Sequence, residues 1–516
     1  MDGLDAAPRP RLRPVSLTNV CARLGFDPGT ATGVQVTGVT LDSRAVRRGD
    51  LFVGLSGERV HGARFSTQAR EDGAVAVLTD SGGREYVPED MPCIVIPDPR
   101  GSVGEVAAEI YGRPAEHLLM LGVTGTNGKT TTTYLLESGL RAAGHRTGVV
   151  GTVGTIIDGV VFETTRTTPE ATELHALLAV MRERGVTAVA MEVSSHALAM
   201  GRVDGCRFDV VGFTQLSVDH LDFHGTEQAY FDAKMLLFSP EHSRTAVVTV
   251  DDEAGRRIAA NAAVPVTTLG TSEDAVWRIS DVQTREQGGY HYVLQGPGRV
   301  RRVDEVSLMG TFNVSNAALA HVMLDQSGID LRASARGIAA CRGVPGRMER
   351  VGPSQVSLVV DYAHTTDALR RALDALRPPS GDGRLIVVFG CGGDRDHTKR
   401  EPMGEAAAWG ADVVVITDDN PRSEDAALIR QAVKDGTERV EAASRAQISV
   451  IPDRREAIRM AVGAARQGDV VLVAGKGHEA GQESGGVTTP FDDRRELEAA
   501  WAALQLSSDE TQAGNS

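Results

Sequence analysis

Short apolar runs alternate with helix-length amphipathic segments along the middle of the chain. The runs Leu118–Val123, Thr187–Val193 and Val210–Leu216 are nearly continuous in apolar residues. Strands of this kind are typical of sheets that are covered on both faces. Because helix-length segments separate the runs, the pattern indicates βαβ units and a mostly parallel sheet. The sequence therefore predicts an α/β fold for this region.

Related patterns occur on both sides of this region. Before it, short strands are expected at Val36–Leu41, Leu51–Leu55, Val75–Leu78 and Cys93–Ile96. After it, a Rossmann-like layer is expected from the apolar runs Leu358–Asp361, Leu385–Phe389, Val413–Thr417 and Val470–Ala474. Glycine and proline interrupt the pattern at Gly343–Glu349, which we interpret as a hinge. We therefore expect three domains: a mixed α/β domain at 15–114, a central domain at 115–343 and a Rossmann-like domain at 344–505.

Length and charge narrow the possible functions. A chain of 516 residues is long enough for three domains that each bury a core. The formal net charge of −15 argues against a nucleic-acid surface or an anionic membrane as the main partner. The five cysteines include no C-x-x-C pair, which favours a reducing compartment over a disulfide framework or a zinc site. No apolar signal-peptide core or membrane-spanning run occurs, so we expect a cytoplasmic monomer.

A glycine-rich loop joins the first central run to a predicted helix. Residues 124–130 read Thr-Gly-Thr-Asn-Gly-Lys-Thr. Glycines let backbone N–H groups approach an anion, and the helix N-terminus adds its positive end. In such a loop Lys129 can reach the terminal phosphates and the Thr130 hydroxyl can bind Mg²⁺. Val123 stands where the usual P-loop pattern has a glycine, so an ordinary glycine-rich turn is the alternative. The context favours a P-loop-type ATPase domain, with ATP contacts at Gly125, Thr126, Asn127, Gly128, Lys129, Thr130 and Thr131.

Two of the predicted strands end in groups that can bind a metal ion. Glu192 lies in one apolar run, where a buried carboxylate needs a partner. His220 follows the next run, although a lone histidine is more often structural. Because the ends of parallel strands meet at one edge of a sheet, we predict that both side chains bind Mg²⁺ beside the phosphate loop. Lys234 precedes an apolar helical stretch and, on its own, reads as a surface lysine.

Three loops after strands of the last domain carry charged residues. They are Gly393–Asp396, Asp418–Arg422 and Gly475–Glu479, and we expect them to converge at the strand ends. Guanidinium groups bind a carboxylate bidentately, whereas carboxylates and carbonyl groups accept hydrogen bonds from an ammonium group. The set therefore suits a zwitterionic amino acid. The predicted contacts are Arg395, Asp419, Asn420, Pro421, Arg422, Gly475 and Glu479.

Several motifs resemble those of a known enzyme family. Gly-Thr-Asn-Gly-Lys-Thr is similar to the ATP loop of the Mur ligases and of folylpolyglutamate synthase, which join an amino acid to a carboxylate. Thr-Leu-Asp-Ser-Arg and Gly-Asp-Leu-Phe-Val resemble the UDP-binding N-terminal domain of Mur ligases. Met-Glu-Val-Ser-Ser-His and Asp-His-Leu-Asp-Phe-His-Gly match the Mur ligase pattern as well. Asp-Asn-Pro-Arg is similar to the family signature for diaminopimelate rather than lysine.

This resemblance implies an ATP-dependent ligase of peptidoglycan precursor synthesis. Such an enzyme adds diaminopimelate to the D-Glu carboxylate of UDP-MurNAc-L-Ala-D-Glu through an acyl phosphate, with Mg²⁺ as cofactor and ATP as co-substrate. In the family the lysine at the place of Lys234 is carbamylated and binds a second Mg²⁺. The implied catalytic residues are Lys129, Glu192, His220 and Lys234, the implied metal ligands are Thr130, Glu192, His220 and Lys234, and further nucleotide contacts are Asn313 and Arg347.

The resemblance also implies contacts to the UDP-MurNAc-dipeptide. They are Leu41, Ser43, Glu58, Arg59, Val60, Arg166, Thr167, Thr168, Ser194 and Arg202. Met200 stands where the family often has glutamine. One alternative is a folylpolyglutamate synthase-like ligase, which has no reason to carry Asp-Asn-Pro-Arg or a UDP-binding domain. The other is a non-catalytic nucleotide-binding relative, which would have lost residues such as Lys129 or Glu192.

Overall fold

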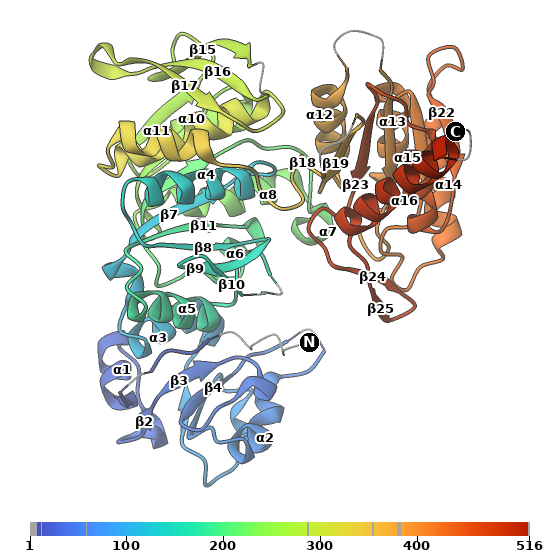
Figure 1. Cartoon of the computed structure of the whole chain (residues 1–516). Helices are drawn as coiled ribbons and strands as arrows, with labels where there is room; N and C mark the ends of the chain where they lie inside the picture. Colours follow the sequence, from blue (N-terminus) through green and yellow to red (C-terminus); the bar gives the residue numbers. More distant parts are fainter. Residues whose placement is uncertain are drawn as a thin grey trace.

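The computed structural model contains three bodies, each built around its own main sheet (Figure 1). It describes residues 8–11, 13–57, 59–162, 164, 166–285, 288–352, 355–378 and 383–513, without the side chains of 299 and 506–513. Helices cover both faces of all three sheets, so the predicted three-part α/β architecture is confirmed. The boundaries proposed after residues 114 and 343 stay predictions. No helix of the described chain is long and apolar enough to cross a membrane.

The first body is a small parallel sheet with the order β3-β4-β5-β6. Its strands are β3 (Gly38–Thr40), β4 (Asp50–Gly54), β5 (Ala76–Thr79) and β6 (Cys93–Val95). Its helices are α1 (Leu17–Leu24), α2 (Ser66–Glu71) and α3 (Pro99–Ile110). A separate pair of short strands is formed by β1 (Val15–Ser16) and β2 (Gln35–Val36). Leu51 and Val53 face α1 and α3, whereas Phe52 faces α2, as the alternation along a strand requires. Arg9 pairs with Asp50, so the chain contacts this body upstream of residue 15.

The second body contains an eleven-stranded sheet with the order β10-β9-β8-β11-β7-β12-β13-β14-β15-β16-β17. The parallel strands are β8 (Thr147–Gly151), β11 (Ala188–Glu192), β7 (Leu119–Thr124), β12 (Phe208–Phe213), β13 (Ser243–Thr249), β14 (Val266–Gly270) and β15 (Trp277–Thr284). Antiparallel strands extend both edges: β9 (Gly154–Ile157), β10 (Val160–Phe162), β16 (Tyr290–Gln295) and β17 (Arg301–Val306).

Different sets of helices cover the two faces of this central sheet. The helices α4 (Lys129–Ala142), α10 (Phe312–Gln326) and α11 (Leu331–Ala340) cover one face. The other face is covered by α5 (Ala171–Glu183), α6 (Ser195–Ala199), α8 (Glu227–Met235) and α9 (Glu253–Asn261). Because β7 lies between β11 and β12, the phosphate loop that follows β7 lies between the ends of those two strands. The fold thus brings the loop, Glu192 and the segment of His220 to one edge, as the sequence predicts.

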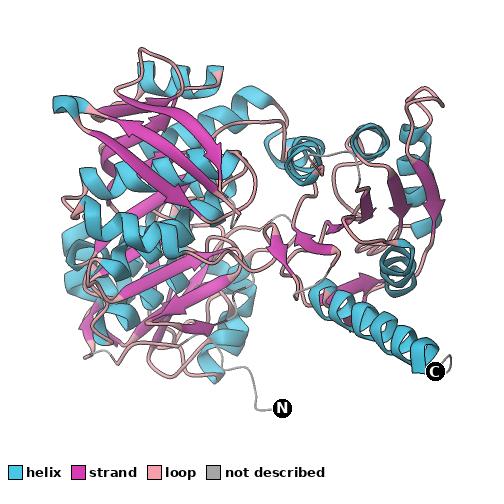
Figure 2. Ribbon diagram, turned by 45° about the horizontal axis from the view of Figure 1, so that its top comes forward, coloured by secondary structure: helices cyan, strands magenta, loops and turns pink. Residues whose placement is uncertain are grey.

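The third body has a six-stranded sheet with the order β18-β19-β23-β20-β21-β22, parallel except for β18. Its strands are β18 (Glu349–Arg350), β19 (Ser357–Asp361), β20 (Leu385–Phe389), β21 (Val413–Ile416), β22 (Gln447–Val450) and β23 (Val470–Ala474). One face carries α12 (Thr366–Leu376), α13 (Arg400–Gly410) and α14 (Ala426–Thr437), and the other carries α15 (Arg454–Ala464) and α16 (Asp493–Ala513). A hairpin of β24 (Gly481–Ser484) and β25 (Val487–Pro490) projects beside the sheet (Figure 1). The C-terminal helix α16 runs along the outside of this body (Figure 2).

Candidate functional site

A cleft of about 470 Å³ lies between the central and the C-terminal body. The central body contributes Asn127, Gly128, Lys129, Thr130, Glu192, His220 and Asn313 to its lining, and the C-terminal body contributes Arg347, Asp361, Tyr362, His364 and Arg371. Asn127 Nδ2 donates a weak hydrogen bond of 3.4 Å to Asp367 Oδ2 across the two bodies. The predicted phosphate loop, three of the four implied metal ligands and the nucleotide contacts Asn313 and Arg347 therefore border one cavity, whereas Lys234 is not among its lining residues.

The phosphate loop depends on its glycines. Gly125 and Gly128 have φ values of 145° and 88°, and a Cβ on Gly125 would lie 1.9 Å from Thr214 Oγ1. No side chain caps the N-terminus of α4, so its backbone N–H groups are open to an anion. Lys129 Nζ donates to the carbonyl oxygens of Gly125 at 3.0 Å and Thr126 at 2.9 Å. The loop therefore offers positive charge and open backbone donors at one place.

Glu192 is a buried carboxylate without a salt bridge among the described residues. Its side chain accepts hydrogen bonds from Thr130 Oγ1 at 2.9 Å, Thr152 N at 2.7 Å and Thr152 Oγ1 at 3.0 Å. The residue is 1% exposed. A buried carboxylate lacking a direct counter-charge is costly, and with the Thr130 hydroxyl it forms an oxygen donor set that suits Mg²⁺. The described chain contains no group of three or more His, Cys, Asp or Glu residues placed to hold a metal, so other oxygen donors would have to complete such a site.

Lys234 is buried, so its interpretation as a surface lysine is wrong. The residue is 1% exposed, and its Nζ donates to the Gly125 carbonyl oxygen at 2.9 Å. Lys129 donates to the same oxygen, which places two amines close together. Burial, followed by the charge of Lys129, lowers the pKa of Lys234 well below its usual value. A neutral amine is the form that reacts with CO₂, so this environment meets the chemical requirement for carbamylation.

His220 lies at the start of the short helix α7 (Leu221–His224), with a left-handed φ of 55°. Its Nε2 lies 3.4 Å from Asp219 Oδ2. Burial lowers the pKa of His220 to about 4, and the nearby charges of Lys129 and Lys234 act in the same direction. The carboxylate of Asp219 opposes this shift. The ring is therefore neutral at pH 7, which is the form that can bind a metal.

Arg347 and Asn313 both line the cleft, one from the C-terminal body and the other from the central body. The Arg347 guanidinium stacks 4.4 Å from the centroid of the Tyr362 ring, and its buried Nε has no hydrogen-bond partner within the described chain. A buried, unpartnered guanidinium nitrogen at a cleft suits an anionic ligand. Asn313 Nδ2 donates to the Met309 carbonyl oxygen at 2.6 Å, so its predicted contact with adenine stays a prediction.

The predicted UDP contacts lie on loops of the first body. Leu41 and Ser43 are half-buried, whereas Arg59 and Val60 are exposed. Glu58 lies outside the described residues. Hydrogen bonds from Arg44, and the more distant charge of Arg166, lower the pKa of Asp42 despite its partial burial. Arg166 belongs to the central body, so the loops of the first two bodies face each other where the substrate is predicted to lie.

The predicted dipeptide contacts lie between this loop region and the cleft. Thr168 Oγ1 donates to the Glu192 carbonyl oxygen at 2.9 Å, and Arg202 Nε lies 2.9 Å from Glu170 Oε1. Thr167 and Ser194 line the cleft. Met200 Sδ lies 3.2 Å from a terminal nitrogen of Arg202, so the residue that departs from the family pattern contacts the guanidinium directly.

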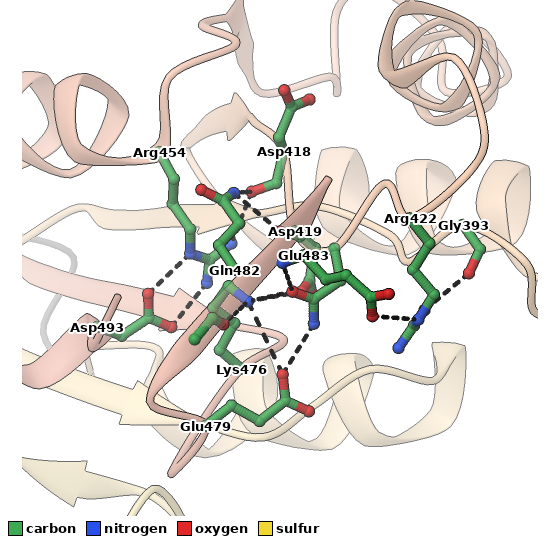
Figure 3. Close-up of polar contacts among 12 residues, drawn as sticks. Gly393, Asp418, Asp419, Arg422, Arg454, Lys476, Glu479, Gln482, Glu483 and Asp493 are labelled. Atoms are coloured by element: carbon green, nitrogen blue, oxygen red, sulfur yellow. Dashed lines mark hydrogen bonds and ion pairs between the residues drawn. The ribbon is translucent and has the colours of Figure 1, made fainter. Parts of the chain in front are cut away.

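The three charged loops of the C-terminal body converge as predicted, because they follow the neighbouring strands β23, β20 and β21 (Figure 3). Asn420 Nδ2 donates to Glu479 Oε2 at 2.9 Å. Arg422 Nη1 donates to the Gly393 carbonyl oxygen at 2.7 Å. Arg422 also has a left-handed φ of 53°, a conformation that side-chain-bearing residues rarely adopt. Burial, and then the Asp419 carboxylate, raise the pKa of Glu479.

Two findings concern the predicted amino-acid site. Arg395 is exposed and makes no hydrogen bond or salt bridge among the described residues. Its contact with the amino acid therefore stays a prediction. Tyr362 was missed by sequence reasoning, although its ring stacks against Arg347 and it lines the cleft. Lys476 and Thr152 were missed as well. Lys476 lies inside the Gly-Lys-Gly-His-Glu motif, which was the available signal, whereas Thr152 stands in a β-turn without a motif.

Three family models match the chain. The model of the Mur ligase family catalytic domain matches residues 35–111, that of the Mur ligase middle domain matches 123–324, and that of the Mur ligase glutamate ligase domain matches 346–477. Together they cover most of the sequence and fall in the three bodies of the structure.

Several named proteins and solved structures are similar to this chain. The chain is 51% identical to UDP-N-acetylmuramoyl-L-alanyl-D-glutamate--2,6-diaminopimelate ligase from Streptomyces avermitilis, over 95% of this chain and 98% of that protein. A solved structure of an enzyme with this name is 33% identical, has a TM-score of 0.68 and covers 96% of this chain and 100% of its own. Folylpolyglutamate synthase from Mycobacterium tuberculosis, complexed with ADP, is 19% identical with a TM-score of 0.61, over 73% of this chain and 92% of its own. This last similarity concerns the fold alone.

Proposed function

The chain belongs to the Mur ligase family, and from this premise we propose that it adds 2,6-diaminopimelate to the D-Glu carboxylate of UDP-MurNAc-L-Ala-D-Glu at the expense of ATP. The product is a precursor of peptidoglycan. The observation that carries this proposal is the convergence of Arg422, Asn420 and Glu479 on neighbouring loops of the C-terminal body, which also forms one wall of the phosphate-loop cleft. The pocket offers a guanidinium to the distal carboxylate of diaminopimelate and acidic acceptors to an ammonium group.

The residues of the cleft suit a two-step reaction. An oxygen of the D-Glu carboxylate attacks the γ-phosphorus, which releases ADP and leaves an acyl phosphate. Lys129 and Arg347, which both line the cleft, would neutralise the negative charge of the phosphate during this attack. The neutral amine of diaminopimelate then attacks the acyl carbon, the bond to the bridging oxygen breaks, and inorganic phosphate leaves as the amine loses a proton. Asn420, Arg422 and Glu479 orient the amino acid rather than transfer protons.

The donor groups of the cleft fit the magnesium ions that the family implies. Thr130 and Glu192 would hold one ion, and His220 with Lys234 in its carbamate form would hold another. The ions would supply charge neutralisation at the phosphate oxygens. The carbamate would form when the neutral Lys234 amine adds to CO₂ and a proton is released.

Several further features belong to the same proposal. The loops with Ser43, Arg59 and Arg166 would hold the UDP-MurNAc-dipeptide across the first two bodies. Rotation about residues 343–349 would bring the amino-acid pocket to the acyl phosphate and exclude water. We further propose that the enzyme acts in the cytoplasm as a monomer, with domains at 15–114, 115–343 and 344–505.

The test is the choice between two amino acids. Purified enzyme with ATP and UDP-MurNAc-L-Ala-D-Glu is expected to form tripeptide from diaminopimelate with a kcat/KM roughly 10²-fold or more above that for L-lysine, because lysine lacks the second carboxylate that would pair with Arg422. Reactions without ATP serve as the control. Equal use of both amino acids would overturn the selectivity argument, and tripeptide formation without ATP would overturn the assignment as an ATP-dependent ligase.

A further inference from the structure

A fully buried ammonium group lies under the amino-acid pocket. Lys476 follows β23 between Gly475 and Gly477, and its side chain is 0% exposed. Its Nζ donates to Asn420 Oδ1 at 2.8 Å and to the Gly481 carbonyl oxygen at 2.8 Å (Figure 3). The lysine therefore joins the loop after β21 to the start of the β24–β25 hairpin, and it lies too deep to be reached by a ligand of the pocket.

We propose that Lys476 is a positioning residue for amino-acid selection, which fixes the amide of Asn420 and keeps the acidic side of the pocket negatively charged. The inference rests on the proposed function, because it concerns how the same pocket takes its amino acid. It assigns no contact with substrate to Lys476 itself. Its two parts, the orientation of an amide and the balance of charge, follow from separate sets of contacts.

The first part concerns the orientation of the Asn420 amide. Asn420 Oδ1 accepts from Lys476 Nζ at 2.8 Å and from Glu483 N at 3.0 Å. Asn420 Nδ2 donates to Glu479 Oε2 at 2.9 Å. A flipped amide would turn its NH₂ group toward two donors and its oxygen toward a carboxylate, so all three hydrogen bonds would be lost. An ammonium group can only donate, and Lys476 therefore permits one orientation alone.

The second part concerns the charge of the pocket. Lys476 Nζ lies 3.4 Å from Asp419 Oδ1 and 3.8 Å from Glu479 Oε2. Two carboxylates thus share one ammonium group and leave an excess negative charge for the ammonium group of a substrate. Besides Lys476 and Asp419, the groups near enough to interact electrostatically with Glu479 are Arg422, Arg454 and Tyr362.

Loss of the lysine charge would change the protonation of this acidic pair. Burial and Asp419 already raise the pKa of Glu479, while Lys476 opposes them. Without Lys476 the pKa of Glu479 rises further, and a protonated Glu479 no longer accepts a substrate ammonium group as an anion. The affinity for the amino acid would then improve as the pH is raised and Glu479 loses its proton.

The decisive variant is Lys476→Met, because methionine keeps the length of the side chain and removes both the charge and the donors. The KM for diaminopimelate at pH 7 is expected to rise about tenfold or more, since Asn420 Oδ1 and the Gly481 carbonyl oxygen each lose a hydrogen-bond donor. The KM values for ATP and for UDP-MurNAc-L-Ala-D-Glu are expected to stay unchanged. Between pH 6.5 and 8.5 the variant's KM for diaminopimelate should fall as the pH rises, more steeply than that of the unaltered enzyme. Lys476→Arg, which restores the charge, should recover the pH profile.

A matched control separates positioning from general destabilisation. Arg384 pairs with Asp469 at 2.7 Å at the opposite end of the same sheet, so Arg384→Met weakens this body without touching the pocket. It should leave the KM for diaminopimelate and its pH profile unchanged. If Lys476→Met does not fold, Lys476→Gln takes its place, because it keeps a donor but not the charge and should show the same pH dependence.

The outcomes distinguish this inference from the proposed function. If the unaltered enzyme forms tripeptide while an uncharged replacement of Lys476 keeps its KM and pH profile, Lys476 only fills space and the inference is wrong. If equal changes appear in Arg384→Met, the effect is structural and the inference is wrong as well. If the unaltered enzyme forms no tripeptide at all, the proposed function itself fails.

Discussion

The phosphate loop and the proposed amino-acid pocket are built in different ways. The phosphate loop is one short segment, residues 124–130, which uses backbone groups and glycines with left-handed φ values. The amino-acid pocket is assembled from three separate loops and a hairpin, and its geometry depends on buried charges such as Lys476 and Asp419. The first site is therefore specified locally, whereas the second exists only after the sheet of the C-terminal body has formed.

This difference implies different sensitivities to substitution. A backbone-built phosphate site is general, since any nucleoside triphosphate presents the same oxygens to the same N–H groups. A side-chain network is selective, because each hydrogen bond fixes the next one. Substitutions at the first site should thus abolish the reaction with every amino acid, and substitutions at the second should change which amino acid is used.

The largest effect is expected at the phosphate loop. Lys129→Ala removes the ammonium group that the loop holds by two carbonyl oxygens, and kcat is expected to fall by about 10³-fold with diaminopimelate as substrate. The KM for diaminopimelate should change little. Steady-state assays measure both constants, and Lys434→Ala on α14, away from the cleft, is the control. A large rise in the KM for diaminopimelate with an unchanged kcat would contradict the separation of the two sites.

A smaller and selective effect is expected at Arg422. Replacement by methionine removes the guanidinium that is held by the Gly393 carbonyl oxygen at 2.7 Å. We expect kcat/KM for diaminopimelate to fall by about 10²-fold, while that for L-lysine stays the same or improves, because lysine has no second carboxylate to pair. Competition assays with both amino acids give the ratio directly. Equal losses for the two amino acids would show that Arg422 only supports the fold.

Much of the fold could be predicted from apolar runs. The runs at Leu385–Phe389 and Val470–Ala474 coincide with β20 and β23, because strands buried on both faces leave a continuous apolar signal. The antiparallel strands β16 and β17 were not predicted. Strand β17 mixes exposed and buried positions, as the 65% exposure of Val303 illustrates, and β16 has only partly buried residues at both ends, so neither leaves a continuous apolar run.

The candidate site could be predicted where its functional residues lie within one sequence motif. Lys129, Thr130 and the loop of Asn420 could be named because their neighbours in sequence are also their neighbours in space. The burial of Lys234 could not be predicted, since it depends on Gly125, which lies 109 residues away in the chain. Tyr362 was missed for the same reason. Lys476 lies in a recognised motif, but its burial depends on Asn420, which lies 56 residues away in the chain.

The central claim is that ATP activates the D-Glu carboxylate as an acyl phosphate for attack by the amino acid, and an oxygen-label experiment tests it most directly. The substrate UDP-MurNAc-L-Ala-D-Glu is prepared with ¹⁸O in the reacting carboxylate, and the inorganic phosphate released with ATP and diaminopimelate is analysed by mass spectrometry. The account predicts one ¹⁸O atom in the phosphate for each tripeptide formed, because the bridging oxygen leaves with phosphorus. Tripeptide formed together with unlabelled phosphate would contradict it.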